Sequence, residues 1–163
     1  MKKSNLLAAC ELQNVSRVEQ CLAQQDNPNV QWGPLETTPL HIACQDGSLP
    51  IIRLLLADPR TNVNQAMNDG ATPIIIACQN GHHTSVQLLL ADPRTDVNQA
   101  MNDGNTPIFI ACQNEHHTIV KQLLADQRTN VNQAMNDGAT PLFIACLNGN
   151  DTIVKLLVAD QRT

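Results

Sequence analysis

Large aromatic side chains are nearly absent from this chain. Its 163 residues include two Phe, one Trp and no Tyr, so aromatic residues make up 2% of the composition. A conventional globular core depends on such rings for much of its buried area. Small and aliphatic residues are plentiful instead, and they suit a core that forms between similar stacked units.

Long apolar runs and an excess of positive charge are also missing. No stretch reaches the roughly 18 to 20 apolar residues that span a bilayer, and the first residues lack a secretory signal pattern. The net charge of -5 argues against a sequence-independent grip on nucleic acid, which needs many Lys and Arg side chains. We therefore expect a cytoplasmic protein that binds neither nucleic acid nor membrane.

Patterns typical of catalysis and metal binding do not occur either. The chain has no Cys-x-x-Cys pair, no Ser/His/Asp set and no phosphate-binding glycine loop. The pairs His82-His83 and His116-His117 fall on equivalent positions of stacked helices, about 10 Å apart, which is too far for one shared ion. Five Cys share one phase and are expected to be small buried residues: Cys10, Cys44, Cys78, Cys112 and Cys146. We expect no enzymatic activity, no metal and no cofactor.

Internal repetition is what the chain has in abundance. The phrase Asn-Asp-Gly-x-Thr-Pro occurs three times with a period of 34 residues, and residues 63–96 match residues 97–130 at 26 of 34 positions. A fixed period of this length indicates a stacked solenoid. We expect one array over residues 1–163, with a degenerate capping unit at 1–29 and repeats at 30–62, 63–96, 97–130 and 131–163.

Each unit is expected to contain two short helices. In the unit at 63–96, Thr72 is suited to cap the first helix and Gly81 to end it. Thr84 is expected to cap the second helix, which stops before Pro93. The Asn-, Asp- and Gly-rich segment between units has the composition of an extended hairpin or loop. Helices this short do not persist alone in water, so stacking must stabilise them.

These motifs resemble the ankyrin repeat. Residues 38–43 read Thr-Pro-Leu-His-x-Ala, Gly81-His82 stands at the turn between helices, and Val63-Asn64 precedes a hairpin, as do its two copies. The resemblance implies an all-α solenoid of stacked antiparallel helix pairs with projecting hairpin loops. It also implies a non-enzymatic protein that binds a protein partner through hairpin tips and a concave inner-helix face. The near-identical copies resemble arrays of intracellular bacteria and protists, where such proteins act as effectors in the host cytosol.

The chain departs from the family's pattern in its loops. The segment at 92–96 is one residue longer than usual, and only His41 keeps the family's His after Thr-Pro-Leu. We expect apolar packing to replace some of the family's hydrogen bonds. The resemblance gives the loop Asn a structural hydrogen bond and implies that it can also be hydroxylated; this residue is Asn64, Asn98 and Asn132.

Candidate partner-binding residues occupy positions that the family leaves exposed. Trp32 and Leu35 lie where the first hairpin breaks the repeated phrase, and Trp often anchors an interface. The alternative is that Trp32 covers the edge of the degenerate first unit. The other candidates form hairpin and inner-helix rows, for which a plain solvated face is the alternative: Met67, Asn68, Asp69, Gln79, Asn80, Met101, Asn102, Asp103, Gln113, Asn114, Met135, Asn136, Asp137, Leu147 and Asn148.

The two ends of the array differ in sequence. The first helix pair carries polar residues such as Glu11 and Arg17, as a terminal unit requires, whereas residues 153–158 repeat the apolar interior pattern. Three hypotheses for function therefore stay open. The chain is an interaction scaffold, the targeting module of a larger enzyme that continues past residue 163, or a structural protein that self-associates through an uncapped last repeat.

Overall fold

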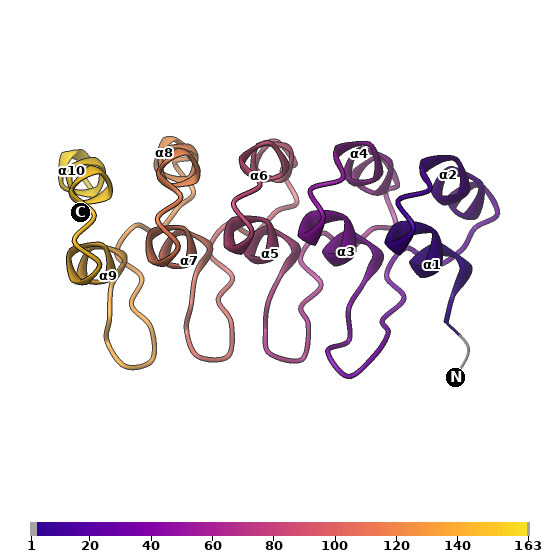
Figure 1. Cartoon of the computed structure of the whole chain (residues 1–163), viewed down its shortest axis with the longest axis horizontal. Helices are drawn as coiled ribbons and strands as arrows, with labels where there is room; N and C mark the ends of the chain where they lie inside the picture. Colours follow the sequence, from indigo (N-terminus) through magenta and orange to yellow (C-terminus); the bar gives the residue numbers. More distant parts are fainter. Residues whose placement is uncertain (1–2, 163) are drawn as a thin grey trace.

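The computed structural model describes residues 3–162, and these form ten α-helices in five antiparallel pairs (Figure 1). The first helix of each pair belongs to an inner layer and the second to an outer layer, and the pairs follow one another along a single axis. The helices are α1 (Asn5–Glu11), α2 (Val15–Ala23), α3 (Pro39–Gln45), α4 (Leu49–Ala57), α5 (Pro73–Gln79), α6 (His83–Ala91), α7 (Pro107–Gln113), α8 (His117–Ala125), α9 (Pro141–Leu147) and α10 (Asp151–Ala159).

Four of the inner helices begin with the predicted Thr-Pro sequence. Thr38, Thr106 and Thr140 each accept a hydrogen bond at the side-chain oxygen from the backbone N–H three residues later. Pro follows at the first helical position, where a missing N–H costs nothing. Thr72 takes the same capping position before α5, but its side chain makes no capping bond. The helix starts are therefore as expected, while one hydroxyl is not used.

The start of the second helix differs from the sequence prediction. Gly81 adopts a φ of +73° just beyond α5, which confirms the expected glycine turn. The backbone N–H of His82 then donates to the carbonyl of Ala77 at 3.0 Å. This bond closes the turn so early that α6 begins at His83, with His82 at the capping position. The expectation that Thr84 caps this helix was wrong, because Thr84 lies inside its first turn.

Equivalent small residues form the core between neighbouring pairs. Cys10, Cys44, Cys78 and Cys112 are buried, and burial raises the pKa of the Cys112 thiol to about 12. These thiols stay protonated at neutral pH and pack as small apolar groups. Cys146 is exposed, which corrects the prediction that all five share a buried position. Its environment differs because no unit among the described residues follows α9 and α10.

His41 forms hydrogen bonds that apolar packing replaces in the next two units. Its Nε2 lies 3.1 Å from the carbonyl oxygen of Ala71, and its Nδ1 lies 2.8 Å from the hydroxyl of Thr38. Because a carbonyl only accepts, Nε2 carries the proton and Nδ1 accepts from Thr38. Burial lowers the pKa of His41 to about 4, so the ring is neutral at pH 7. Later units place buried Ile75 and Phe109 here, as the sequence comparison predicted.

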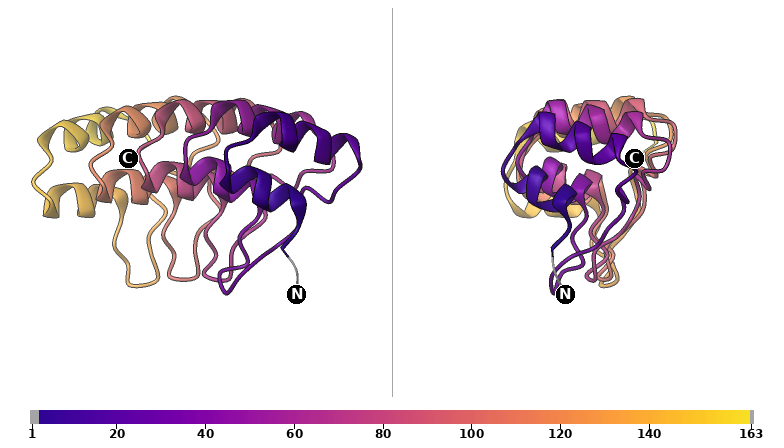
Figure 2. Two further views of the ribbon diagram at one scale, coloured as in Figure 1. Left: turned by 45° about the vertical axis from the view of Figure 1, so that its right-hand side comes forward. Right: turned by 90° about the vertical axis from the view of Figure 1, so that its right-hand side faces the viewer.

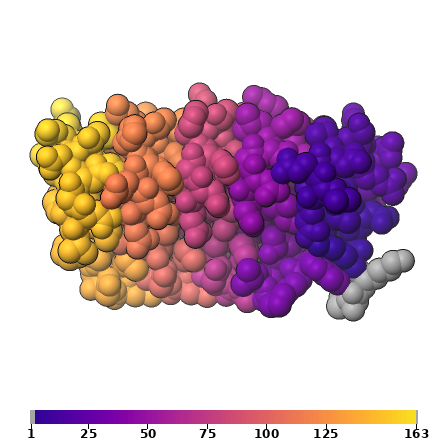
Figure 3. Space-filling view, viewed as in Figure 1, coloured from indigo at the N-terminus to yellow at the C-terminus, as the bar shows by residue number. Residues whose placement is uncertain are grey.

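The hairpins form a row along one side of the stack (Figure 2). The backbone N–H of Asn102 donates to the carbonyl of Asp69 at 2.9 Å, and its side-chain amide donates to the carbonyl of Asn68 at 3.0 Å. Asn136 repeats both bonds one unit later, to Asp103 and Asn102. The space-filling view shows the five units in unbroken contact from end to end (Figure 3). Hydrogen bonds between hairpins thus extend the stacking of the helices.

Candidate functional site

A groove of about 480 Å³ lies beside the first hairpin, at the N-terminal end of the stack. Leu7 and Glu11 come from α1, and Ile42 and Asp46 come from α3 and the residue that caps its end. Each pair is spaced by one helical turn, so both members face the same side of their helix. The rest of the lining is residues 32–35 and Thr37 of the hairpin, together with Lys3 and Gln45. The structure therefore brings inner helices and hairpin together at the two strongest sequence candidates.

Trp32 owes its place in the groove to a change in the turn. In a later hairpin, the loop is closed by a backbone hydrogen bond in which the N–H of Met67 donates to the carbonyl of Ala71 at 2.9 Å. In the first hairpin, Trp32 and Thr37 exchange two backbone bonds of 3.0 Å instead. Thr37 corresponds to Ala71, but its partner Trp32 stands one residue before Gly33, the equivalent of Met67, so the loop closed by this pair is one residue longer. Trp32 is half-buried and Leu35 is 52% exposed, so part of this apolar surface is accessible.

The other hairpin candidates make contacts within the scaffold. Met67 and Met101 are half-buried and pack against the core. The side-chain amides of Asn68, Asn102 and Asn136 each donate to a backbone carbonyl of the preceding hairpin. The following carboxylates accept the N–H two residues later and so brace their own turns; these are Asp69, Asp103 and Asp137. Met135 is half-buried in the last hairpin.

The inner-helix candidates divide into exposed and bonded side chains. Gln79 and Gln113 are exposed, and their side chains form no hydrogen bond with the described residues. Asn114 and Asn148 donate their amides to the backbone carbonyls of those two Gln residues, at 3.3 and 2.9 Å. Asn80 donates within its own helix to Ile76 at 2.8 Å. The Gln side chains are therefore available to a partner, while the side chains of Asn114 and Asn148 link neighbouring units.

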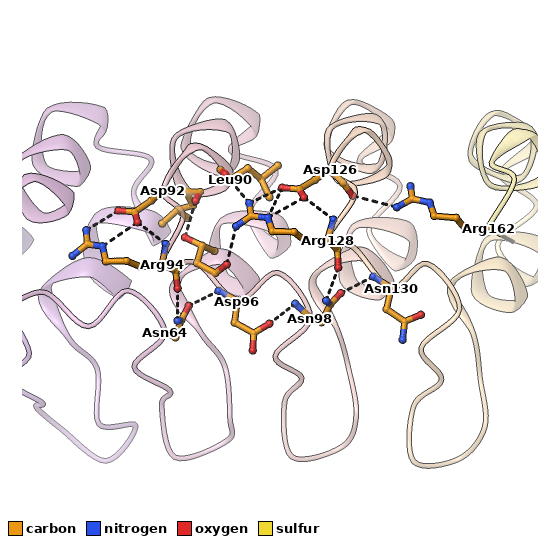
Figure 4. Close-up of polar contacts among 12 residues, drawn as sticks. Asn64, Leu90, Asp92, Arg94, Asp96, Asn98, Asp126, Arg128, Asn130 and Arg162 are labelled. Atoms are coloured by element: carbon orange, nitrogen blue, oxygen red, sulfur yellow. Dashed lines mark hydrogen bonds and ion pairs between the residues drawn. The ribbon is translucent and has the colours of Figure 1, made fainter.

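An Asp-x-Arg ladder, which was not predicted from the sequence, runs along the stack between the outer helices and the hairpins (Figure 4). Arg128 forms a two-pronged ion pair with Asp126, at 3.0 and 2.6 Å, and donates to the carbonyls of Thr95 at 3.2 Å and Leu90 at 2.8 Å. These bonds from Arg128 hold the pKa of Asp126 below its usual value. The same arrangement recurs at Arg94 and Arg162. The loop after each outer helix supplies the Asp and Arg residues whose bonds link one unit to the previous one. The repetition of Asp-x-Arg in the sequence could have indicated this contact.

The loop residues Asn64 and Asn98 lie beside this ladder, and both the amide nitrogen and the oxygen of each side chain are hydrogen-bonded (Figure 4). The side-chain amide of Asn64 donates to the carbonyl of Arg94 at 2.7 Å, and its side-chain oxygen accepts the N–H of Asp96 at 2.8 Å. Asn98 makes the same pair of bonds with Arg128 and Asn130. Asn132 donates to the carbonyl of Arg162. Each of these side chains therefore tethers its own loop to the loop of the next unit.

The first His of each pair bonds to the neighbouring unit. The Nε2 of His82 lies 2.9 Å from the carbonyl of Gln45, and that of His116 lies 3.4 Å from the carbonyl of Gln79. Within residues 3–162, no three His, Cys, Asp or Glu side chains are grouped so that they could hold a metal ion. The His side chains thus take part in stacking.

The repeating inner and outer helices, with their row of hairpins, match a known family. A family model described as ankyrin repeats (3 copies) matches residues 6–101 and again residues 93–163. The chain belongs to the ankyrin-repeat family. Ankyrin repeats are protein–protein interaction modules and are typically not enzymatic. The comparison with curated proteins gives no match.

The ankyrin array was also compared with what a membrane span requires. None of the described helices is both long enough and apolar enough to cross a bilayer. Each has seven or nine residues, whereas a span needs about 20.

Proposed function

We propose that this ankyrin array binds a protein partner through its hairpins and inner helices, with Trp32 and Leu35 as the anchor of the interface. The accessible apolar surface around the groove carries the proposal. Trp32 is half-buried and Leu35 is 52% exposed beside a hollow of about 480 Å³. Interface hot spots combine such aromatic and aliphatic side chains with a pocket that excludes water. Met67, Met101 and Met135 extend the surface along the hairpins.

Replacing Trp32 by Ala is expected to weaken binding of a captured partner by at least ~2 kcal/mol, as for other aromatic hot spots. A pull-down with the intact array identifies the partner, and calorimetry then compares the two proteins. Val158→Ala is the matched control, because Val158 is also apolar and exposed but lies on α10 at the far end. Equal affinity of the parent and Trp32→Ala would remove Trp32 from the interface.

Self-association is a second candidate function, and the last unit favours it. Leu147 is 69% exposed, Phe143 and Val158 are exposed as well, and a hollow of about 440 Å³ lies beside Phe143. The opposite end exposes Leu12 and Val15, so a second copy stacked head to tail would cover apolar surface on both.

Light scattering across a concentration series tests self-association. The apparent mass is expected to rise with protein concentration, and Leu147→Asp is expected to suppress the rise because it places a charge on the contact. A constant monomer mass over the same range would rule this candidate out. The host-effector role and the attached enzyme remain predictions that rest on the sequence.

A further inference from the structure

We propose that the groove beside Trp32 takes an extended peptide segment in which an aliphatic or aromatic side chain is flanked by Lys or Arg. The inference rests on the proposed function, because it names the chemistry of the partner at that same surface. Three features of the groove carry it: an apolar floor, unpaired carboxylates at the rim, and a row of free amide side chains that leads away from it.

The floor and walls of the groove suit one large apolar side chain. Leu7 is fully buried, Ile42 is half-buried and Trp32 forms a wall. The volume of about 480 Å³ falls within the roughly 300 to 1,000 Å³ typical of ligand pockets. If a side chain of the peptide fills the groove, the peptide backbone would lie at the rim, beside Leu35 and the end of α3.

The rim carries negative charge that nothing in the described residues neutralises. Lys3 is the basic side chain that lines the groove, and it pairs with Glu11. Glu36 in the hairpin and Asp46 after α3 are exposed, and neither forms an ion pair within residues 3–162. Asp46 lines the groove, and Glu36 stands in the hairpin between the lining residues Leu35 and Thr37. These two carboxylates favour a cation next to the anchor.

Within residues 3–162, the basic side chains other than Lys3 lie away from this surface. Four Arg side chains pair with Asp in the loops after the outer helices: Arg60, Arg94, Arg128 and Arg162. The others lie on outer helices: Arg17, Arg53, Lys121 and Lys155. Asp69, Asp103 and Asp137 continue the negative row along the hairpins. Acidic side chains occur on both sides of the stack, whereas these basic side chains lie in the loops or on the outer helices, so the hairpin side favours a basic segment.

The row of Gln side chains on the inner helices favours a bound peptide with an extended backbone. Gln45, Gln79 and Gln113 are exposed at equivalent positions on successive inner helices, and their side chains are free of hydrogen bonds among the described residues. An amide side chain both donates and accepts, as the backbone of an extended peptide requires. A nucleic acid backbone, by contrast, would be repelled by the same carboxylates.

Trp32 provides the measurement, because it is the sole Trp in the chain and lines the groove. The probes are Trp-free nine-residue peptides with a central Leu flanked on each side by two Arg, two Ser or two Glu. The Arg peptide is expected to shift the emission of Trp32 at concentrations where the Glu peptide does not. Its affinity is expected to fall as the salt concentration rises, since exposed charge pairs are screened.

Removing the rim charges tests the role of Glu36 and Asp46. The double variant Glu36→Gln/Asp46→Asn is expected to bind the Arg peptide about five-fold more weakly, in line with two exposed charge pairs. The matched control Glu19→Gln/Asp151→Asn makes the same change in net charge on α2 and α10, where both residues are exposed. It is expected to bind as the parent does.

Three results would overturn the inference: no peptide shifts the emission, the Arg and Glu peptides bind alike, or the double variant behaves as its control does. None of these affects the pull-down, in which Trp32→Ala is compared with the parent for a captured protein. A partner that needs Trp32 but ignores the rim charges would support the proposed function and refute the basic segment. The two proposals therefore fail separately.

Discussion

Replacing Phe109 by Ala is expected to lower the free energy of unfolding by about 3 to 5 kcal/mol, the usual cost of emptying a buried Phe site. Phe109 on α7 is 2% exposed. Phe143 holds the same position one repeat later, on α9, yet it is 56% exposed. Phe143→Ala is expected to cost less than about 1 kcal/mol, because surface substitutions have small effects. Urea unfolding, followed by the helical circular dichroism signal, measures both.

The Phe pair separates local sequence from stacking. Both residues follow a Thr-Pro cap, and their helices have the same length. The expected difference therefore comes from the unit that covers Phe109. An equal loss for the two variants would mean that something covers Phe143 in solution. If the loss for Phe143→Ala then grew with protein concentration, the cover would be a second copy of the chain.

Replacing Gly104 by Ala is expected to cost about 2 to 4 kcal/mol, from left-handed strain of roughly 1 to 2 kcal/mol and a clash of similar size. Gly104 has a φ of +92°, and an added Cβ would lie 2.7 Å from the backbone nitrogen of Asn136. Gly138 has a φ of +90°, but nothing lies within 4 Å of the corresponding Cβ. Gly138→Ala is expected to cost the strain alone, about 1 to 2 kcal/mol.

The Gly pair isolates the contact between hairpins, because the backbone strain is common to both positions. Thermal unfolding of the two variants and the parent gives the difference. The clash at Gly104 involves the hairpin of the next unit, whose Asn136 N–H donates to Asp103. Equal destabilisation by the two substitutions would show that the hairpins do not depend on this close approach.

Local structure was predictable wherever one motif determines it. The caps at Thr38 and Thr106 and the glycine turn at Gly81 follow from short-range chemistry that the sequence shows directly. Thr84 was misplaced because the backbone bond from His82 to Ala77 closes the turn first. A sequence shows which side chains are able to cap a helix. It does not show which backbone hydrogen bond ends the preceding turn and so sets the first residue of the helix.

The candidate site was predictable at its centre and not at its walls. Trp32 and Leu35 were found because they interrupt a repeated phrase. Ile42 and Asp46 were missed because they look like ordinary residues of an inner helix, and the hollow beside them arises only when α1, α3 and the hairpin meet. Asn68, predicted to face a partner, is exposed and also donates its side-chain amide to the carbonyl of Pro34 in the preceding hairpin, a contact that the sequence does not display.

Repetition in the sequence alone determined the family, the helix pairs and the phase of the buried positions, because a 34-residue period repeats the same local chemistry in each unit. The tertiary structure decided which copies are covered. Phe109 and Phe143 are the same residue in the same motif, and the presence of a following unit makes one a core residue and the other a surface residue. Burial in a stack is a property of neighbouring units, so it cannot be deduced from one repeat.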